Sequence, residues 1–442
     1  MTSGQFVSFF YVTLYIMVPM VSNLLFGQAY WSIYFYTDPP FWALALIVGL
    51  WLIIASPIMR IRLARKRRPN KQLRLLEAFI RQHTLKLAIL IALLIGLLYS
   101  PTSAAFRYTS GGISSGGIQL ILVLILKSVA SIALMWLLVV YVRQDLHLRR
   151  SDRLAVWILA GIILYTVNGT ASFLTATFFL LFAASPKLFV HLVFIETDSP
   201  LLSAKSLLHL LSPVLILALF FMALMVGDSV KQSGQIRLDN HSVTFSITWL
   251  AVRVVDGISS HYYALAQFFD QRVYQILEQF SYPLSYPLSS IEYRIGQLLG
   301  LNVQRPEIQS ISRLNFIANS FKISESEGTS PGFFASFLYI MPLPFGILAA
   351  MIYIRWIISV IDRFFDLPGF KLSLFGSFFV LLQFLFAYQS PPDFLILLDN
   401  TVISIFLVWL FARFGENARL QQSFDGSPVP GSNYPLAHAT HS

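Results

Sequence analysis

Ten apolar segments, each long enough or nearly long enough to cross a bilayer, dominate this sequence of 442 residues. A hydrocarbon core of about 30 Å requires roughly 17 to 25 apolar residues per helix. Backbone polar groups in lipid must be satisfied within the chain, so such segments fold as helices. We therefore expect an all-α, polytopic transmembrane helical bundle with about ten spans. The expected spans are residues 6–27, 40–59, 87–99, 118–142, two short ones within 154–186, 207–226, 334–360, 372–388 and 394–412.

The low charge content separates this chain from soluble domains. Only 12% of its residues are charged and 56% are hydrophobic, whereas soluble domains average about 25% charged residues. The net charge of +10 comes largely from basic residues in short loops beside apolar segments, a distribution typical of membrane orientation. We therefore expect membrane lipid around the chain and no nucleic-acid partner. The chain has no cysteine, which excludes disulfides and thiolate metal sites.

The basic residues predict the orientation of the bundle. Residues 60–86 hold ten Lys or Arg and one acid, Glu77, in a segment short enough for the positive-inside rule. A second basic cluster occupies residues 143–153. If the chain turns outward at Asn168-Gly169 between two short helices, 20 of the 31 Lys and Arg lie in cytoplasmic loops. This arrangement places both termini in the cytoplasm.

Residues 154–186 leave one alternative open. These 33 residues are too many for one span and slightly few for two. A single span would move later basic residues outside, against the positive-inside rule: Arg363, Lys371, Arg413 and Arg419. We therefore favour two spans here.

The predicted spans divide the chain into four regions. Residues 1–226 carry the first seven helices with basic cytoplasmic loops, and residues 333–412 carry the last three. Between them, residues 227–332 form one large, partly helical periplasmic loop. Residues 413–442 form a cytoplasmic tail rich in Pro, Ser and Gly, which we expect to be disordered.

The loop of residues 227–332, called the polar island below, is where we expect the function. Its 106 residues include eight basic and nine acidic side chains, and long loops that persist in compact proteins are usually functional. Apolar residues recur every three or four positions between Thr244 and Phe280. This spacing predicts one or two amphipathic helices that pack on the bilayer or on the bundle.

Four residues mark the predicted spans as unusual. Pro342 and Pro344 predict a kinked or re-entrant start to the eighth span, because proline removes a helical hydrogen bond. Lys127 and Asp399 are charges inside predicted spans, so they must face the bundle interior or water.

Common soluble-enzyme motifs are missing from the sequence. There is no GxxxxGK[ST], HExxH, GxSxG or GxGxxG. His241, Asp239 and His261 are too scattered along the chain to predict a metal site. We therefore expect no metal and no other cofactor.

Polar residues of the amphipathic run form the candidate site. Arg can hold a phosphate through two parallel hydrogen bonds, and Asp or His can accept a hydroxyl proton. Arg253 stands in the apolar sequence WLAVRVV, where a charge is costly without an anionic partner. The competing interpretation is an ordinary surface helix on which Arg253 pairs with Asp256. The candidates in this run are Arg253, Asp256, His261, Tyr262, Tyr263 and Arg272.

Three stretches in order resemble the Wzy-type polymerases of oligosaccharide repeat units. They are the turn VNGTAS, the outer-loop sequence RVVDGISSHYYALAQF and the sequence NSFKISESEGTSPGFFASFLY before the next helix. The resemblance spans residues from about Ile118 to Asp362. It implies a bacterial inner-membrane glycosyltransferase that joins undecaprenyl-pyrophosphate-linked repeat units on the periplasmic side, without metal. It also implies a chain-length regulator and a flippase of the same pathway as partners.

The resemblance assigns roles to individual residues. Arg253 matches the arginine of the outer-loop motif, and Thr329, Pro331 and Gly332 match the Thr-Pro-Gly entry to the following helix. The departing lipid pyrophosphate needs positive charge, and the attacking sugar hydroxyl needs positioning and a base. The implied catalytic residues are Arg253, Asp256 and His261.

One departure from the family pattern shifts the substrate-binding assignment. Related sequences often carry Arg after the Gly-Thr-type turn, where this chain has Ala171. Phosphate binding is therefore expected from arginines elsewhere. The substrate-binding candidates are Arg107, Arg272, Tyr262, Tyr263, Lys322, Glu325 and Thr329.

Two further functions stay open. A related ligase would transfer finished glycan to another acceptor, and a transporter or flippase would move the lipid-linked glycan without bond chemistry. Transporters commonly show halves with matching broken helices and a site at mid-membrane. Here the polarity is concentrated in one asymmetric loop, which favours the polymerase.

Overall fold

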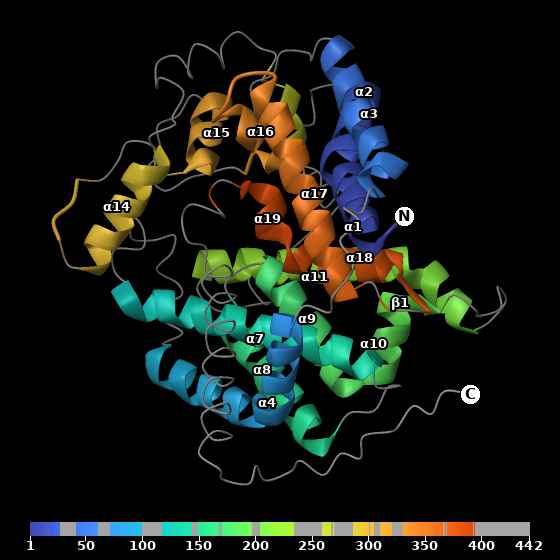
Figure 1. The fold of residues 1–442 in the computed structure, drawn as a ribbon, viewed down its shortest axis with the longest axis vertical. Coiled ribbons are helices and arrows are strands. Elements are labelled where there is room, and N and C mark those ends of the chain that lie inside the picture. Colours follow the sequence, from blue (N-terminus) through green and yellow to red (C-terminus); the bar gives the residue numbers. More distant parts are fainter. Residues whose placement is uncertain are drawn as a thin grey trace, which may run out of the picture.

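Apolar segments of the sequence form helices, because a helix satisfies its own backbone hydrogen bonds without water. The computed structural model is mostly helical (Figure 1). It describes residues 1–26, 41–60, 71–99, 117–143, 149–167, 170–196, 204–233, 259–266, 268, 286–299, 301–304, 310–320, 330–365, 367, 369–391 and 393.

In the first half of the chain the helices coincide with the predicted apolar segments. In the second half most of them are shorter than the predicted segments. Up to the polar island they are α1 (Ser3–Val12), the π-helical turn η1 (Thr13–Met17), α2 (Val18–Phe26), α3 (Phe41–Ala55), the 3-10 turn η3 (Pro57–Arg60), α4 (Lys71–Leu98), α7 (Gly117–Arg143), α8 (Arg150–Tyr165), α9 (Thr170–Ala184), α10 (Pro186–Val193) and α11 (Ala204–Ser233). Later in the chain they are α14 (Tyr286–Leu298), α15 (Ile311–Ser320), α16 (Gly332–Leu338), α17 (Phe345–Phe365), α18 (Leu374–Gln383) and α19 (Leu385–Gln389).

The helices are compatible with a membrane protein. Among the described residues, three are long and apolar enough to cross a bilayer: Ser3–Leu25, Ile125–Val142 and Phe345–Asp362. Shorter apolar helices accompany them at Leu44–Ala55, His83–Leu98, Thr170–Ala184, His209–Leu224 and Leu374–Gln383. Large apolar side chains are exposed on α4, α11 and α17, as lipid-facing surfaces require: Leu97, Leu210, Val214 and Ile352.

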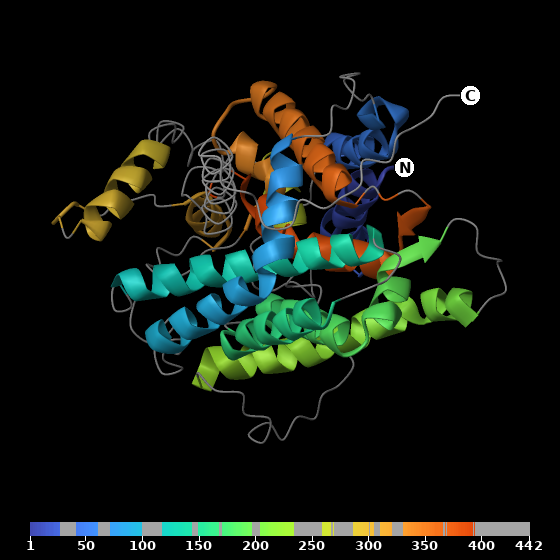
Figure 2. The ribbon, with the colours of Figure 1, turned by 60° about the horizontal axis from the view of Figure 1, so that its bottom comes forward.

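Two groups of helices build the molecule. Helices α4, α7, α8, α9 and α11 pack side by side in one group, which Figure 2 shows as stacked layers. Helices α1, α3, α16 and α17 form the other. Between them, α18 contacts both α1 and α11, and its phenylalanines pack edge-on against those of α9 and α10.

Residues 154–186 form two helices, as the sequence predicts. Helix α8 ends at Tyr165 and α9 begins at Thr170. The predicted turn at Asn168-Gly169 lies outside the described residues. The amine of Lys127, on α7, donates a 2.8 Å hydrogen bond to the Thr166 carbonyl at the end of α8. A lysine satisfies an orphan carbonyl at a helix C-terminus in this way. Lys127 is half-buried and bonds to a neighbouring helix, which agrees with the prediction that it faces the bundle interior or water.

A two-stranded antiparallel sheet corrects the all-α expectation. Strand β1 (Phe194–Glu196) pairs with β2 (Phe370–Leu372) in the register Phe194↔Leu372 and Ile195↔Lys371. Strands of three residues are too short to show an alternating pattern in the sequence. They form because α18 packs directly on the end of α10: a Cβ on Gly376 would lie 2.1 Å from the Val193 carbonyl oxygen.

The eighth span is irregular, as predicted, and takes the form of a hairpin. Helix α16 folds back on α17, with the rings of Phe337 and Tyr353 5.5 Å apart. Pro342 and Pro344 lie in the exposed turn between the two helices, where no helical hydrogen bond is lost. Gly346 allows the close approach, because a Cβ there would meet Leu338.

At one end of the bundle, the N-terminus lies beside the end of α17 and the residues that follow α3. The Gly4 amide donates to a carboxylate oxygen of Asp362 at 2.7 Å, at the end of α17. The Gln5 side chain donates to the Ser56 carbonyl at 2.9 Å, just after α3. Strand β2 contacts α1 as well, so the small sheet belongs to the same end.

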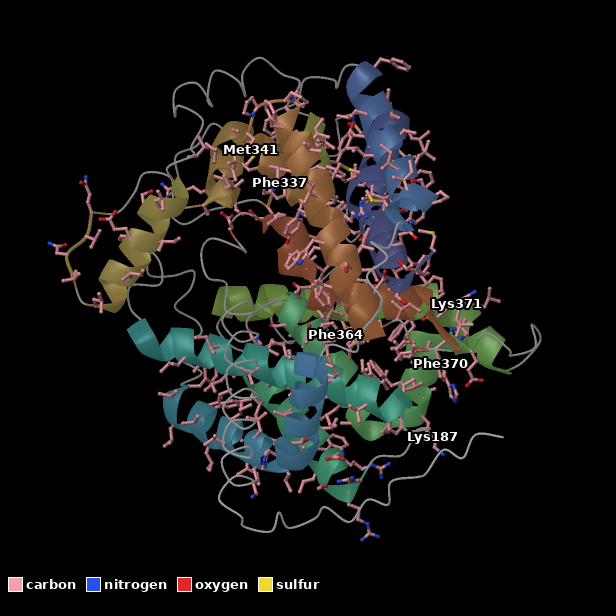
Figure 3. All side chains as sticks on the ribbon, viewed as in Figure 1. Lys187, Phe337, Met341, Phe364, Phe370 and Lys371 are labelled. Atoms are coloured by element: carbon pink, nitrogen blue, oxygen red, sulfur yellow. The ribbon has the colours of Figure 1, made fainter. Side chains whose placement is uncertain are left out.

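The small sheet and the turn of the α16–α17 hairpin lie far apart in the molecule. Figure 3 shows Phe370 and Lys371 at the sheet, Lys187 well below it, and Phe337 and Met341 on the hairpin near the top of the view. Lys187 and Lys371 are both exposed.

Two helices run beyond their predicted bounds. Helix α4 begins at Lys71, inside the predicted basic loop, and α11 continues to Ser233, into the polar island. The extension of α4 is rich in Lys, Arg, Gln and Glu, which are good helix formers. The predicted last span and the tail, residues 394–442, lie outside the described residues.

Candidate functional site

The structure describes three of the predicted site residues. His261, Tyr262 and Tyr263 lie in a helical segment, residues 259–266. The other predicted site residues lie outside the described residues: Arg107, Arg253, Asp256, Arg272, Lys322, Glu325 and Thr329.

The segment 259–266 is buried on all sides. All eight of its side chains are buried, including the polar ones of Ser259 and His261. The competing interpretation of an ordinary surface helix predicts an exposed polar face, and for these eight residues it is wrong. His261 and both tyrosines lie in the protein interior.

His261 contacts the first helix of the chain. Its Nδ1 lies 2.8 Å from the hydroxyl of Tyr11, on α1. The ring of Tyr15, one turn further along, stacks on the imidazole with centroids 4.7 Å apart. The imidazole is therefore fixed both by a hydrogen bond and by a ring face.

The contact extends to α19. The Tyr11 hydroxyl donates to the Tyr388 carbonyl at 3.2 Å, and the two rings stack at 4.7 Å. The Tyr388 hydroxyl in turn shares a 2.7 Å hydrogen bond with Ser8. We call these five residues the Tyr11 cluster: Ser8, Tyr11, Tyr15, His261 and Tyr388.

The hydrogen bonds of Tyr11 assign the tautomer of His261. A tyrosine hydroxyl donates once, and the Tyr388 carbonyl can only accept. Both contacts are satisfied when Tyr11 donates to Tyr388 and the Nδ1–H of His261 donates to Tyr11. Burial lowers the pKa of the His261 imidazole to about 3, so the ring is neutral near pH 7.

Gly332 brings the end of the polar island to the same place. Its backbone has a φ of 76°, which favours glycine. A Cβ at this position would lie 2.9 Å from the Tyr11 hydroxyl and 3.0 Å from Cβ of His261. The neighbouring Ser330 hydroxyl donates to the Gln389 carbonyl at 2.5 Å. No larger residue fits here without moving the cluster.

Helix α15 is also attached to the bundle. The Asp393 carboxylate accepts from the backbone amides of Ile311 and Ser312, at 2.9 and 3.2 Å, and so caps the first turn of α15. The Tyr339 hydroxyl donates to the buried Asn315 at 3.0 Å. Parts of the polar island that are far apart in sequence therefore rest on the hairpin and on the end of α19.

Sequence reasoning missed the contribution of the first helix. Ser8, Tyr11 and Tyr15 are spaced three and four residues apart, so they share one helix face. A polar stripe of this kind on an apolar helix is the sequence pattern that could have indicated a contact with another part of the chain. Tyrosines are common enough in membrane helices that the stripe alone did not identify a partner.

Comparisons with protein-family models, curated proteins and solved structures find no match to this chain. Within the part of the chain that the structure describes, no three His, Cys, Asp or Glu side chains are grouped so that they could hold a metal ion.

Proposed function

We propose that this protein is a membrane glycosyltransferase that polymerises undecaprenyl-pyrophosphate-linked oligosaccharide repeat units at the periplasmic face of the bacterial inner membrane. One observation carries the proposal. Two stretches that resemble the polymerases, the one with His261 and the one with Gly332, are 71 residues apart in the sequence and meet at Tyr11. A shared site explains why separate stretches converge on one point.

The proposed reaction is metal-independent. A sugar hydroxyl of one repeat unit attacks the anomeric carbon of another, and the bond from that carbon to the pyrophosphate oxygen breaks. The hydroxyl proton passes to a base, for which Asp256 is the candidate in the outer-loop motif. Arg253 stabilises the charge that develops on the departing lipid pyrophosphate. Arg107 and Arg272 are the next candidates for binding phosphate.

The orientation that we propose has ten spans and cytoplasmic termini. The end of the bundle that joins Gly4, Ser56 and Asp362 then faces the cytoplasm, together with the exposed Lys187 and Lys371. The basic loops of the sequence, residues 60–86 and 143–153, support this orientation. The polar island then faces the periplasm, where a flippase of the same pathway would deliver substrate and a chain-length regulator would act.

Purified protein offers the most direct test. We expect it to convert a lipid-pyrophosphate-linked repeat unit into a ladder of polymers, with or without EDTA. Loss of the protein from cells should truncate the surface glycan to one repeat unit. Repeat units trapped on the cytoplasmic leaflet would indicate a flippase instead, and transfer of finished glycan to another acceptor would indicate a ligase.

A further inference from the structure

Tyr11 is the point where the first span contacts the polar island. Its side chain is fully buried, and its hydroxyl has a partner on each side, His261 and the Tyr388 carbonyl. The contact joins α1, the segment 259–266 and α19, three parts of the chain that lie more than 110 residues apart in sequence. Such a junction fixes the position of one part relative to the others.

The surroundings of His261 favour a positioning role over contact with substrate. Its side chain is only 2% exposed, Tyr15 covers a ring face, and Nδ1 is engaged by Tyr11. Gly332 closes the site from another direction, because even a methyl group there would collide with both residues. A general base has to contact the sugar hydroxyl from which it takes the proton. The buried and engaged His261 is therefore better placed to hold the segment than to act as that base.

We propose that Tyr11 and His261 are a pair of positioning residues that hold the outer-loop motif against the helical bundle. His261 stands eight residues after Arg253 and five after Asp256 in the sequence, so weaker docking of the segment 259–266 is expected to impair the proposed chemistry. This inference rests on the proposed function, and it replaces the catalytic role that the sequence suggests for His261. The pair acts through the Nδ1–H to hydroxyl hydrogen bond.

Tyr11→Phe tests the hydrogen bond while it keeps the ring. The change leaves a buried N–H without its acceptor, which lowers the population of the docked segment and should reduce kcat by about tenfold or more. Tyr353→Phe is the matched control. It also removes a buried hydroxyl that donates to a backbone carbonyl, that of Ala387 at 2.9 Å, but it leaves the Tyr11 cluster intact. We expect it to retain near wild-type activity.

Two replacements of His261 separate positioning from proton transfer. The side-chain amide of Asn can occupy the place of Nδ1 and donate to Tyr11, whereas that of Gln reaches toward the place of Nε2. Positioning predicts that His261→Asn retains activity within about threefold and that His261→Gln loses about tenfold or more. If His261 were the base, Asn would abolish polymerisation as completely as Gln, and this result would overturn the proposal.

Amide hydrogen exchange gives a second readout that needs no activity. Exchange in residues 259–266 should become faster in Tyr11→Phe and stay unchanged in Tyr353→Phe. Equal exchange in both variants would refute the positioning pair, whatever the kinetics. If the wild-type protein fails to polymerise while exchange changes as expected, the proposed function fails and the contact between Tyr11 and His261 stands.

Discussion

Polar side chains that lie wholly or partly inside this apolar chain have specific hydrogen-bond partners. Lys127 satisfies the carbonyl of Thr166, and His261 donates to Tyr11. Each would be costly if it were buried without a partner. The sequence predicts that Lys127 needs a partner but cannot say which one, because the partner is 39 residues away and is a backbone atom.

Arg253 is the residue on which the proposed chemistry depends most. If its guanidinium holds the departing pyrophosphate, Arg253→Ala should lower the rate by about 100-fold or more, as loss of a transition-state hydrogen-bond donor does. Arg253→Lys keeps the charge but loses the planar fork, so it should also be impaired. Polymer length and rate on purified variants check this. A helix-surface pair with Asp256 is worth only about 0.3–0.5 kcal/mol, so near wild-type polymerisation by Arg253→Ala would support that alternative.

The neutral state of His261 predicts a loss of stability in acid. Its pKa is about 3 in the folded protein, compared with 6.5 for an unperturbed histidine. The unfolded chain therefore binds the proton more readily, and the contribution of this residue to stability, complete above pH 6.5, falls by about 1.4 kcal/mol per pH unit toward pH 3. Among the described residues, the titratable side chains that contact the ring are Tyr11 and Tyr15, which stay neutral over this range.

Thermal unfolding of the detergent-solubilised protein between pH 7 and pH 4 measures this dependence. His261→Asn should unfold with a shallower dependence on pH over the same range, because asparagine does not titrate. An identical pH dependence in the variant and the wild type would show that His261 does not contribute to acid sensitivity.

At the scale of helices, the sequence predicts where the apolar helices lie better than it predicts where they end. Apolar length alone predicts α3, α7, α9 and α11, because burial in lipid depends on composition. It does not predict that the segment 259–266 is covered on both faces, since a polar face is compatible with water or with a protein partner. The sequence does not predict the β1–β2 pairing either, because this pairing depends on how α10 and α18 pack against each other.

A designed disulfide tests the strand register. The chain has no cysteine, so a pair introduced at Ile195 and Lys371 can be studied without background. These residues are directly opposite in the register, and opposite Cβ atoms in antiparallel strands lie about 4.5–5.5 Å apart, close to disulfide range. We expect efficient cross-linking, detected as a mobility shift that reductant reverses. A pair at Glu196 and Lys371 should cross-link poorly, because neighbouring residues of a strand point to opposite faces.

At the scale of the whole molecule, the polar island is fastened to the bundle at separate points. His261 contacts Tyr11, Ser330 contacts the end of α19, and Asp393 caps α15. None of these contacts follows from the sequence, because each joins residues that are 59 to 250 positions apart. What the sequence does predict is that amphipathic helices of this region pack on the bilayer or on the bundle.

Orientation in the membrane is the last prediction, and single cysteines test it. Lys371 and Gln304 are both exposed, one beside the small sheet and the other in the polar island. With ten spans and cytoplasmic termini, Gln304→Cys should react with a membrane-impermeant maleimide in intact spheroplasts, and Lys371→Cys should react only after permeabilisation. The absence of native cysteine means that any label reports the introduced thiol. If Gln304→Cys were protected and Lys371→Cys labelled, the polar island would face the cytoplasm. A substrate delivered to the periplasm could not then reach it, and the proposed polymerase would have to be abandoned.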